Sequence, residues 1–255
     1  MFIPRTEYRA HPAINASYLK QVFEYSYWKA QIPTTVTPAM NLGTLAHTLI
    51  LEPNAFAAEY EIFDGDRRTK AGKEAYAALE ASNKTVVSQK DFDAALSMAQ
   101  AVRLQEGCME LLENAHAVEQ SMLFDWGDEK AKAQVDLYTN GGVLVDLKTI
   151  GDISKAERQF FNMHYDLQLA WYEEACNQNG FVVHDVKVMF VESQPPYRVA
   201  LYDVSQPVLN VGTAKANQAL QKWKLQKEMP VPELITGTLE LPAWMDYSDT
   251  ETGPF

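Results

Sequence analysis

The segment AKAQVDLYTNGGVLVDLKT, residues 131–149, constrains the fold of this 255-residue chain more than any other. Asn140-Gly141-Gly142 lies between two stretches in which polar and apolar residues alternate, and this combination is a strong signal for a β-hairpin. Alternation with a period of two predicts that Val135 and Leu137 share one face of the first strand. The segment therefore predicts two neighbouring antiparallel strands.

The hairpin brings two acidic side chains together. If residues 140–142 form a three-residue loop, Asp136 lies directly across from Asp146. Like charges opposed on one sheet face are destabilising unless something lies between them. A divalent cation would remove the conflict, and Lys148 follows two residues along the same face. The alternative is a solvated polar face on which Lys148 screens the two aspartates.

The Asp-x₉-Asp-x-Lys spacing also suits phosphodiester hydrolysis. Two carboxylates on adjacent strands can hold Mg²⁺ or Mn²⁺ and leave further coordination positions to water. Such an ion polarises a phosphodiester oxygen and activates water for attack. A lysine at the same edge, Lys148, can position that water or stabilise the charge that develops at phosphorus.

Charge and cysteine content limit the function classes. The 22 basic and 34 acidic residues give a net charge of −12, which argues against non-specific nucleic-acid binding. A basic surface patch or a bound metal ion can still make one part of the surface positively charged. The two cysteines, Cys108 and Cys176, exclude a four-cysteine zinc or iron–sulfur site built from this chain and suit a reducing compartment.

The sequence offers no membrane signal. It has no run of 18 or more apolar residues, and the N-terminal sequence MFIPRTEYRAHP lacks the apolar region of a signal peptide. We therefore expect a cytoplasmic protein that makes no use of a membrane.

The rest of the chain predicts helices around a sheet. Helices are expected over 15–29, from Asn41 to Pro53, over 73–81, after Ser88 or Asp91, over 154–176 and over 207–227. Further strands are expected over 84–87, 117–126, 182–192 and 197–205. Together they predict one α/β domain, 1–255, whose central mixed sheet is flanked by helices. Its parts are a mostly helical 1–115, a sheet core 116–205, and a C-terminal helix and tail 206–255, in which 246–251 are expected to be mobile.

Two polar features each allow two interpretations. His47 lies on a helix where Gly43 and Ala46 leave a slim surface, and it is either a core or boundary residue or a ligand. The loop 64–73 is either a solvated connection or a patch that contacts phosphates. Its basic residues are Arg67, Arg68, Lys70 and Lys73.

The motifs, taken in order, resemble those of the PD-(D/E)xK nuclease superfamily, in particular the RecB-like branch with the exonuclease VIII (RecE) type of phage and prophage nucleases. The matching fragments are GTLAHTLILEP with His47, DRRTKAGKE, VEQS with Glu119, Asp136 with the hairpin sequence DLK, HYDLQLAWY with Gln168 and Tyr172, and FVESQPPY. They span Ile14 to Trp244. Ala133 and Gln134 depart from the pattern, because relatives often carry a basic residue there.

This resemblance implies a restriction-endonuclease-like core and a role for each matching residue. The implied metal ligands are His47, Asp136, Asp146 and the backbone carbonyl of Leu147. The implied catalytic residues are Lys148, Glu119, which orients water or a second metal, and Gln168 and Tyr172, which support the lysine and contact DNA. The basic loop residues 67, 68, 70 and 73 are the expected DNA contacts.

The implied activity is Mg²⁺-dependent exonuclease digestion of linear double-stranded DNA from its ends in the 5′ to 3′ direction, with Mn²⁺ as a substitute. The implied setting is phage-type recombination with a single-strand annealing protein, and a homo-oligomeric ring would concentrate the few basic residues in a channel. One alternative is a Cas4-like or helicase-associated RecB-type nuclease. Two cysteines are too few for the Cas4 cluster, so no iron–sulfur cluster is expected. The other alternative is a catalytically idle DNA-binding recombination scaffold.

Overall fold

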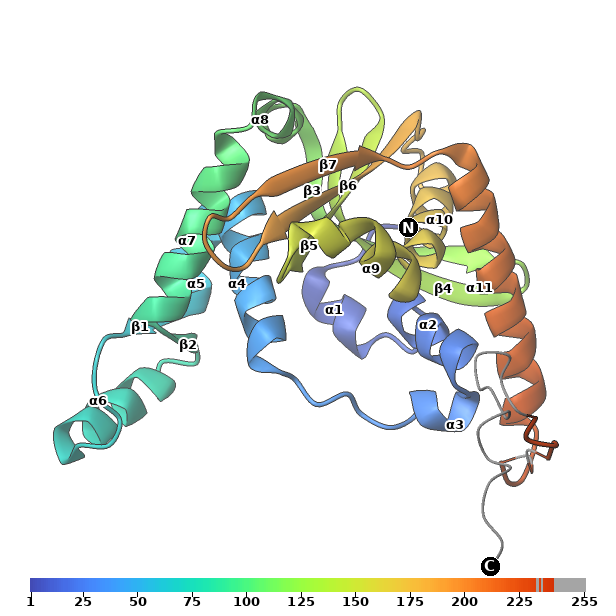
Figure 1. Cartoon of the computed structure of the whole chain (residues 1–255), viewed down its shortest axis with the longest axis horizontal. Helices are drawn as coiled ribbons and strands as arrows, with labels where there is room; N and C mark the ends of the chain where they lie inside the picture. The colour runs from blue at the N-terminus through green and yellow to red at the C-terminus, as the bar shows by residue number, and fades with distance from the viewer. Residues whose placement is uncertain (233, 235, 241–255) are drawn as a thin grey trace, which may run out of the picture.

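A five-stranded mixed sheet with helices on both faces forms the body of the protein in the computed structural model (Figure 1). The structure describes residues 1–232, 234 and 236–240, so the expected mobile stretch 246–251 lies outside the described residues. The sheet strands are β3 (Ala115–Trp126), β4 (Glu129–Thr139), β5 (Val143–Ile150), β6 (Asp185–Glu192) and β7 (Val199–Asp203). The predicted α/β class with a central mixed sheet is confirmed.

The helices are unevenly distributed along the chain. Before the sheet come α1 (Arg5–Ala10), α2 (Ala16–Glu24), α3 (Tyr27–Ala30), α4 (Pro38–Leu51), η1 (Pro53–Ala55), α5 (Phe56–Glu59), α6 (Lys70–Glu80), α7 (Gln89–Arg103) and α8 (Glu106–Glu113). Within and after it come η2 (Ile153–Lys155), α9 (Ala156–Asn162), α10 (Tyr165–Gln178) and α11 (Gln206–Lys227). Within the described part of the chain, no helix is both long and apolar enough to cross a membrane.

The strands follow one another in the order β3-β4-β5-β6-β7. Only β5 and β6 are parallel, and the other neighbours are antiparallel. A parallel pair needs a long crossover, which α9 and α10 supply. This crossover places α10 against the face of the sheet that carries Asp146.

The hairpin has the predicted register, since Leu137 pairs with Val145 and Tyr138 pairs with Leu144. The predicted common face of Val135 and Leu137 is wrong. Val135 packs in the core beside α10, whereas Leu137 packs in the core beside α4 and α7. The alternation breaks at Asp136, because its Oδ2 accepts a hydrogen bond of 2.8 Å from the backbone N–H of Leu147 on the neighbouring strand.

Two apolar cores cover the two faces of the sheet. The first joins Leu19 of α2 and Trp171 of α10 to strand residues such as Phe190. The second joins Leu45 of α4 and Met98 of α7 to residues such as Met189. Helices therefore pack against both faces of the sheet, α2 and α10 on one and α4 and α7 on the other.

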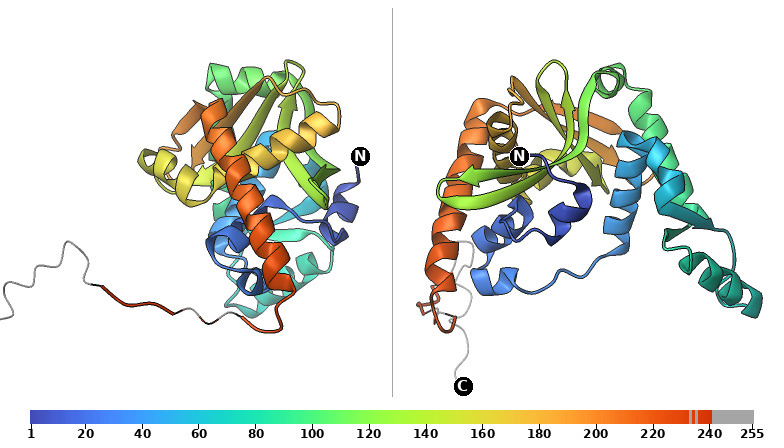
Figure 2. Two further views of the ribbon diagram at one scale, coloured as in Figure 1. Left: turned by 90° about the vertical axis from the view of Figure 1, so that its right-hand side faces the viewer. Right: turned by 180° about the vertical axis from the view of Figure 1, so that it is seen from behind.

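A small arm extends from the body and consists of α6 with β1 (Tyr60–Phe63) and β2 (Thr85–Ser88), which pair in parallel. Figure 2 shows this arm at one end of the molecule and α11 at the other. The sequence predicted β2 but missed β1, which has only four residues. The helix predicted from Lys73 begins at Lys70, where the side chain of Thr69 caps it.

Three further predicted helices have different bounds. The helix expected over 154–176 is interrupted at His164, whose φ of +51° ends the α9 region before α10 starts. The helix expected over 15–29 breaks into α2 and α3 after Glu24. The helix expected from Asn41 starts at Pro38, a favoured residue in the first turn, and Thr37 caps it.

Gly212 allows α11 to lie close to α10. A Cβ at this position would lie 2.1 Å from the backbone oxygen of Asp166. Gly212→Ala is therefore expected to lower the free energy of unfolding by about 2 kcal/mol or more, because the helices must move apart. Gly107→Ala in α8 is the control, since its Cβ would meet Leu201 at an ordinary 3.8 Å. Urea unfolding measures both, and equal effects of the two substitutions would contradict this account.

Candidate metal centre

Three side chains from three elements meet beside strands β3 and β4 of the sheet. His47 comes from α4, Glu119 from β3 and Asp136 from β4, and one ligand atom of each lies within 4.8 Å of the others. His47 Nδ1 is 3.7 Å from Glu119 Oε1 and 3.9 Å from Asp136 Oδ2. Oxygen donors with one imidazole suit a divalent cation such as Mg²⁺ or Mn²⁺. The structure thus brings together a group that could hold a metal ion.

Local backbone features place these side chains. Gly43 brings α4 close to β5, since a Cβ there would lie 3.0 Å from Thr149 Oγ1. Glu119 has a φ of +47°, in the left-handed region that non-glycine residues rarely occupy. Such a residue costs about 1–3 kcal/mol and is typically found where function requires it. The Gln134 side chain donates a short hydrogen bond to the Glu119 carboxylate.

A second polar group adjoins the first on the α10 side. Asp146 is fully buried, and its Oδ2 lies 2.5 Å from Lys148 Nζ. Its Oδ1 accepts a hydrogen bond of 3.0 Å from Gln168 Nε2, which also donates to the Tyr172 hydroxyl at 3.1 Å. The Leu147 carbonyl accepts a bond of 3.5 Å from Lys148 Nζ. All eight residues predicted as ligands or catalytic groups therefore lie in two adjoining clusters.

The acidic cluster is short of hydrogen-bond donors. Among the residues that the structure describes, Asp146 Oδ2 is buried without a hydrogen bond of good geometry, and only the Lys148 ammonium faces it. Burial, and next the charge of Asp146, raise the pKa of Asp136 to about 7. Buried acceptors and mutually repelling carboxylates are what a bound cation would stabilise. The residues present therefore fit a divalent metal.

The two basic groups of the site stay protonated more readily than usual. Burial alone would lower the pKa of Lys148, but Asp146 and Asp136 outweigh it and raise that pKa. Burial would also lower the pKa of His47, and the carboxylates of Asp136 and Glu119 raise it instead. The carboxylates around these two groups therefore favour their charged forms.

Two basic residues of the site carry no signal in the sequence. Lys20 of α2 donates a hydrogen bond of 2.7 Å to Gln168 Oε1, and its Nζ lies 5.0 Å from the centre of the Tyr165 ring. Lys148 Nζ lies 4.9 Å from the same ring centre. Burial, and then the charge of Lys148, lower the pKa of Lys20 to about 8. Arg5 of α1 reaches Glu119 Oε2 at 4.0 Å. The segment of α2 looks like an ordinary helix and no helix was predicted over Arg5–Ala10, so only the folded chain shows these contacts.

The predicted basic patch lies on the arm and not in either cluster. The Arg67 guanidinium lies over the Tyr76 ring at 3.7 Å, while Arg68 forms an ion pair with Asp66 at 2.9 Å. Lys70 and Lys73 are exposed on α6, and Lys70 faces Glu74 at 3.9 Å.

Comparison with known proteins gives a family and a fold. Residues 23–234 match the family described as "PDDEXK-like domain of unknown function (DUF3799)". The chain is similar to a solved structure described as "Putative exonuclease" from Eubacterium rectale, at 13% identity and a TM-score of 0.64, over 92% of this chain and 97% of that chain. It is also similar to a phage related exonuclease from Haemophilus somnus 129PT, at 16% identity and a TM-score of 0.37, over 87% and 99%. No curated protein matches it.

The Eubacterium rectale structure, at 13% identity, shows the fold alone. The family match covers most of the chain and includes both clusters of the site. The expected PD-(D/E)xK-like core is therefore confirmed, and the chain belongs to the PDDEXK-like family of unknown function, DUF3799.

Proposed function

We propose that this protein is a divalent-metal-dependent deoxyribonuclease that hydrolyses phosphodiester bonds from the ends of linear double-stranded DNA. One observation carries the proposal: His47, Glu119 and Asp136 converge directly beside the buried Asp146–Lys148 pair. An amphipathic or solvated sheet face would not gather ligands from three elements at this point. Membership of a PDDEXK-like family supports the same reading.

The chain's own groups divide the work. His47, Glu119 and Asp136 would hold Mg²⁺ or Mn²⁺, with Asp146 and the Leu147 carbonyl beside them. When bound, the cation would polarise a phosphoryl oxygen and make water more acidic. Lys148, kept protonated by its aspartates, directs N–H donors at the phosphate as negative charge develops there. The Gln168 amide donates one hydrogen bond to Asp146 and a second to the Tyr172 hydroxyl, and so orients both side chains.

The finer assignment follows the resemblance in the motifs. It is an exonuclease of the exonuclease VIII type that works in the 5′ to 3′ direction and supplies single strands to an annealing protein in phage-type recombination. The description of the similar Eubacterium rectale structure as an exonuclease agrees with end-directed digestion. A homo-oligomeric ring would enclose the DNA and offset the net charge of −12. Light scattering that gave a monomer under processive conditions would contradict the ring.

Linear and covalently closed circular duplex DNA test this proposal side by side, each with Mg²⁺ or with a chelator. We expect digestion of the linear molecule in Mg²⁺ and none in chelator, while the closed circle stays intact. Cutting of the circle would indicate an endonuclease. A protein that binds DNA but digests neither form in Mg²⁺ would be a scaffold.

Lys20→Met is expected to slow digestion by about tenfold or more, because a charged hydrogen bond is worth about 1.5–3 kcal/mol. Without the Lys20 ammonium at Oε1, the Gln168 amide is free to turn and lose its bond to Asp146. Single-turnover rates in Mg²⁺ measure the effect, with the exposed Lys29→Met as control. Partial recovery in Lys20→Arg would support positioning by charge, and a wild-type rate in Lys20→Met would refute it.

A further inference from the structure

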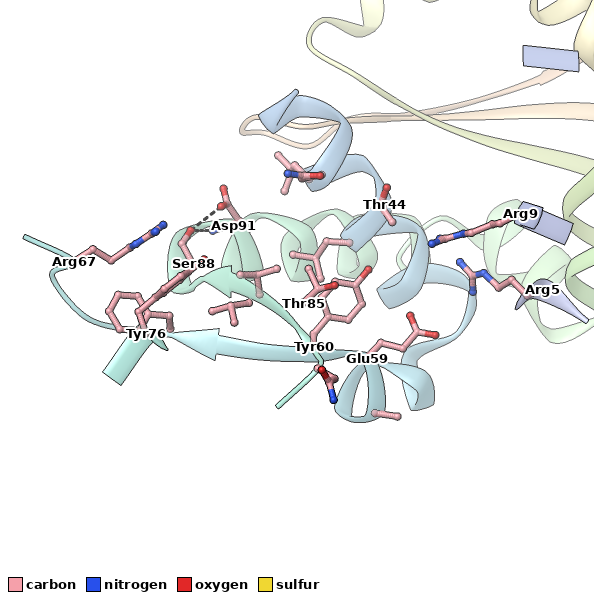
Figure 3. Close-up of a pocket in the computed structure, with 18 of the residues that line it drawn as sticks. Arg5, Arg9, Thr44, Glu59, Tyr60, Arg67, Tyr76, Thr85, Ser88 and Asp91 are labelled. Carbon is pink, nitrogen blue, oxygen red and sulfur yellow. Dashed lines mark hydrogen bonds between the residues drawn. The ribbon is translucent and has the colours of Figure 1, made fainter. Parts of the chain in front are cut away.

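A pocket of about 690 Å³ lies beside the metal centre, between α1, α4 and the arm (Figure 3). Its lining includes Arg5, Arg9, Thr44, Tyr60, Arg67 and Tyr76. Figure 3 shows Arg5 and Arg9 reaching in from one side, while Arg67 and Tyr76 lie at the other end. Of these residues only Thr44 and Arg67 belong to the motifs, and none belongs to the metal cluster.

Two of the three arginines that line the pocket have donors to spare in a strongly acidic chain, whereas Arg5 pairs with Glu52 at 3.0 Å. Within the described part of the protein, Arg9 forms no side-chain hydrogen bond or ion pair, and Arg67 has no carboxylate partner. Their neighbour Arg68 is different, because Asp66 takes its Nε and Nη2 donors at 2.9 Å each. Guanidinium groups left free beside a pocket are suited to phosphate oxygens.

The pocket adjoins the metal centre at Arg5. Arg5 lines it and also reaches Glu119 Oε2 at 4.0 Å. Thr44, another lining residue, precedes His47 by one turn of α4. A strand whose phosphate lies at the metal centre would pass Arg5 on entering the pocket.

The far end of the pocket offers flat surfaces for bases. The Arg67 guanidinium covers the Tyr76 ring at 3.7 Å, and Phe63 supports that ring edge-on at 5.2 Å. Arginine planes and tyrosine rings are the usual stacking surfaces for unpaired bases. The volume is that of a site for a ligand of drug size, so it has room for a few nucleotides of one strand but not for a duplex.

We infer that this pocket holds an unpaired stretch of the DNA strand whose phosphodiester is hydrolysed at the metal centre. The inference rests on the proposed function and adds to it that the end of the duplex must open before cleavage. Arg9 and Arg67 contact phosphates, and Tyr76 with Arg67 stacks a base.

Fluorescence anisotropy of the full chain in chelator tests this, with labelled duplexes that are blunt or carry a 5′ or a 3′ single-stranded tail. We expect at least one tailed duplex to bind more tightly than the blunt one. The double variant Arg9→Ala/Arg67→Ala should abolish this preference. It should also reduce the slope of log affinity against log salt by about 1.4, since each phosphate contact on a single strand contributes about 0.7.

Arg158→Ala is the matched control, because Arg158 is an exposed arginine of α9 that does not line the pocket. It should leave both the preference and the slope unchanged. Equal losses in Arg158→Ala, or an unchanged preference in the double variant, would overturn the pocket assignment while the wild type still digests linear DNA in Mg²⁺. A wild type that neither binds nor digests DNA would overturn the proposed function and the pocket together. Thermal unfolding of each variant confirms that the arm stays folded.

Discussion

Lys148→Met lowers the single-turnover rate of Mg²⁺-dependent digestion of linear DNA by at least about a hundredfold. Removing one preorganised donor to developing charge typically costs about 10²–10³ in rate. Lys148 is suited to that role because Asp146 and Asp136 keep it protonated although it is buried. Its removal also leaves Asp146 with Gln168 as its only remaining side-chain hydrogen-bond donor among the described residues.

Lys155→Met is the control, because Lys155 lies in the same segment of chain but is exposed and, among the residues that the structure describes, pairs only with Asp152 at 3.5 Å. It should digest DNA at the wild-type rate. Thermal unfolding in Mg²⁺ separates a catalytic loss from a folding defect. Undiminished digestion by a folded Lys148→Met protein would refute the role assigned to the lysine.

Asp136→Asn stabilises the metal-free protein above pH 7 and removes its response to divalent cations. Folding raises the pKa of Asp136 to about 7 from 3.8, so the folded state holds the proton more tightly than the unfolded state. The contribution of this group to stability is therefore complete below about pH 4 and is lost as the pH rises through about 7. Each pKa unit corresponds to about 1.4 kcal/mol, so the gain at pH 8 is on the order of a few kcal/mol.

Metal binding has the opposite pH dependence, because Asp136 must lose its proton to act as a ligand. Mn²⁺ should raise the melting temperature of the wild type more at pH 8 than at pH 6, and should not raise that of Asp136→Asn at either pH. Differential scanning fluorimetry from pH 5.5 to 8.5, with chelator or Mn²⁺, measures both effects. Asp185→Asn, an exposed aspartate at the start of β6, should behave as wild type. A similar Mn²⁺ response in Asp136→Asn would show that the ion binds elsewhere.

Local signals predicted the hairpin and several elements around it. The turn residues and the alternation are contained in residues 131–149, and they were enough for the register in which Leu137 pairs with Val145. The 22-residue α11 was predicted to within one residue, because its apolar repeat is long and Pro207 marks its first turn.

Features that depend on distant contacts could not be predicted. The break in alternation at Asp136 depends on a hydrogen bond to the Leu147 backbone. The break at His164 falls inside an uninterrupted apolar repeat, and it is the positive φ of His164 that separates α9 from α10. Strand β1 has only four residues and pairs with a strand 25 residues later in the chain. No local sequence pattern indicates that pairing.

The candidate site shows the same division. Asp136, Asp146 and Lys148 follow from spacing within one hairpin, whereas His47 and Glu119 were expected only from the resemblance in the motifs. The structure places His47 Nδ1 3.7 Å from Glu119 Oε1. Lys20 and Arg5 belong to helices with no motif, and only the packing of α1 and α2 against the site reveals them.

Addition of Mg²⁺ to chelator-stripped protein tests whether the cluster around Asp136 is the metal centre of a nuclease, with release of acid-soluble nucleotides from linear duplex DNA as the readout. We expect no release in chelator, release that rises with Mg²⁺ in the wild type and in Asp185→Asn, and almost none in Asp136→Asn at any Mg²⁺ concentration. Release that persists in chelator, or that Asp136→Asn retains, would contradict metal-dependent digestion with Asp136 as a ligand.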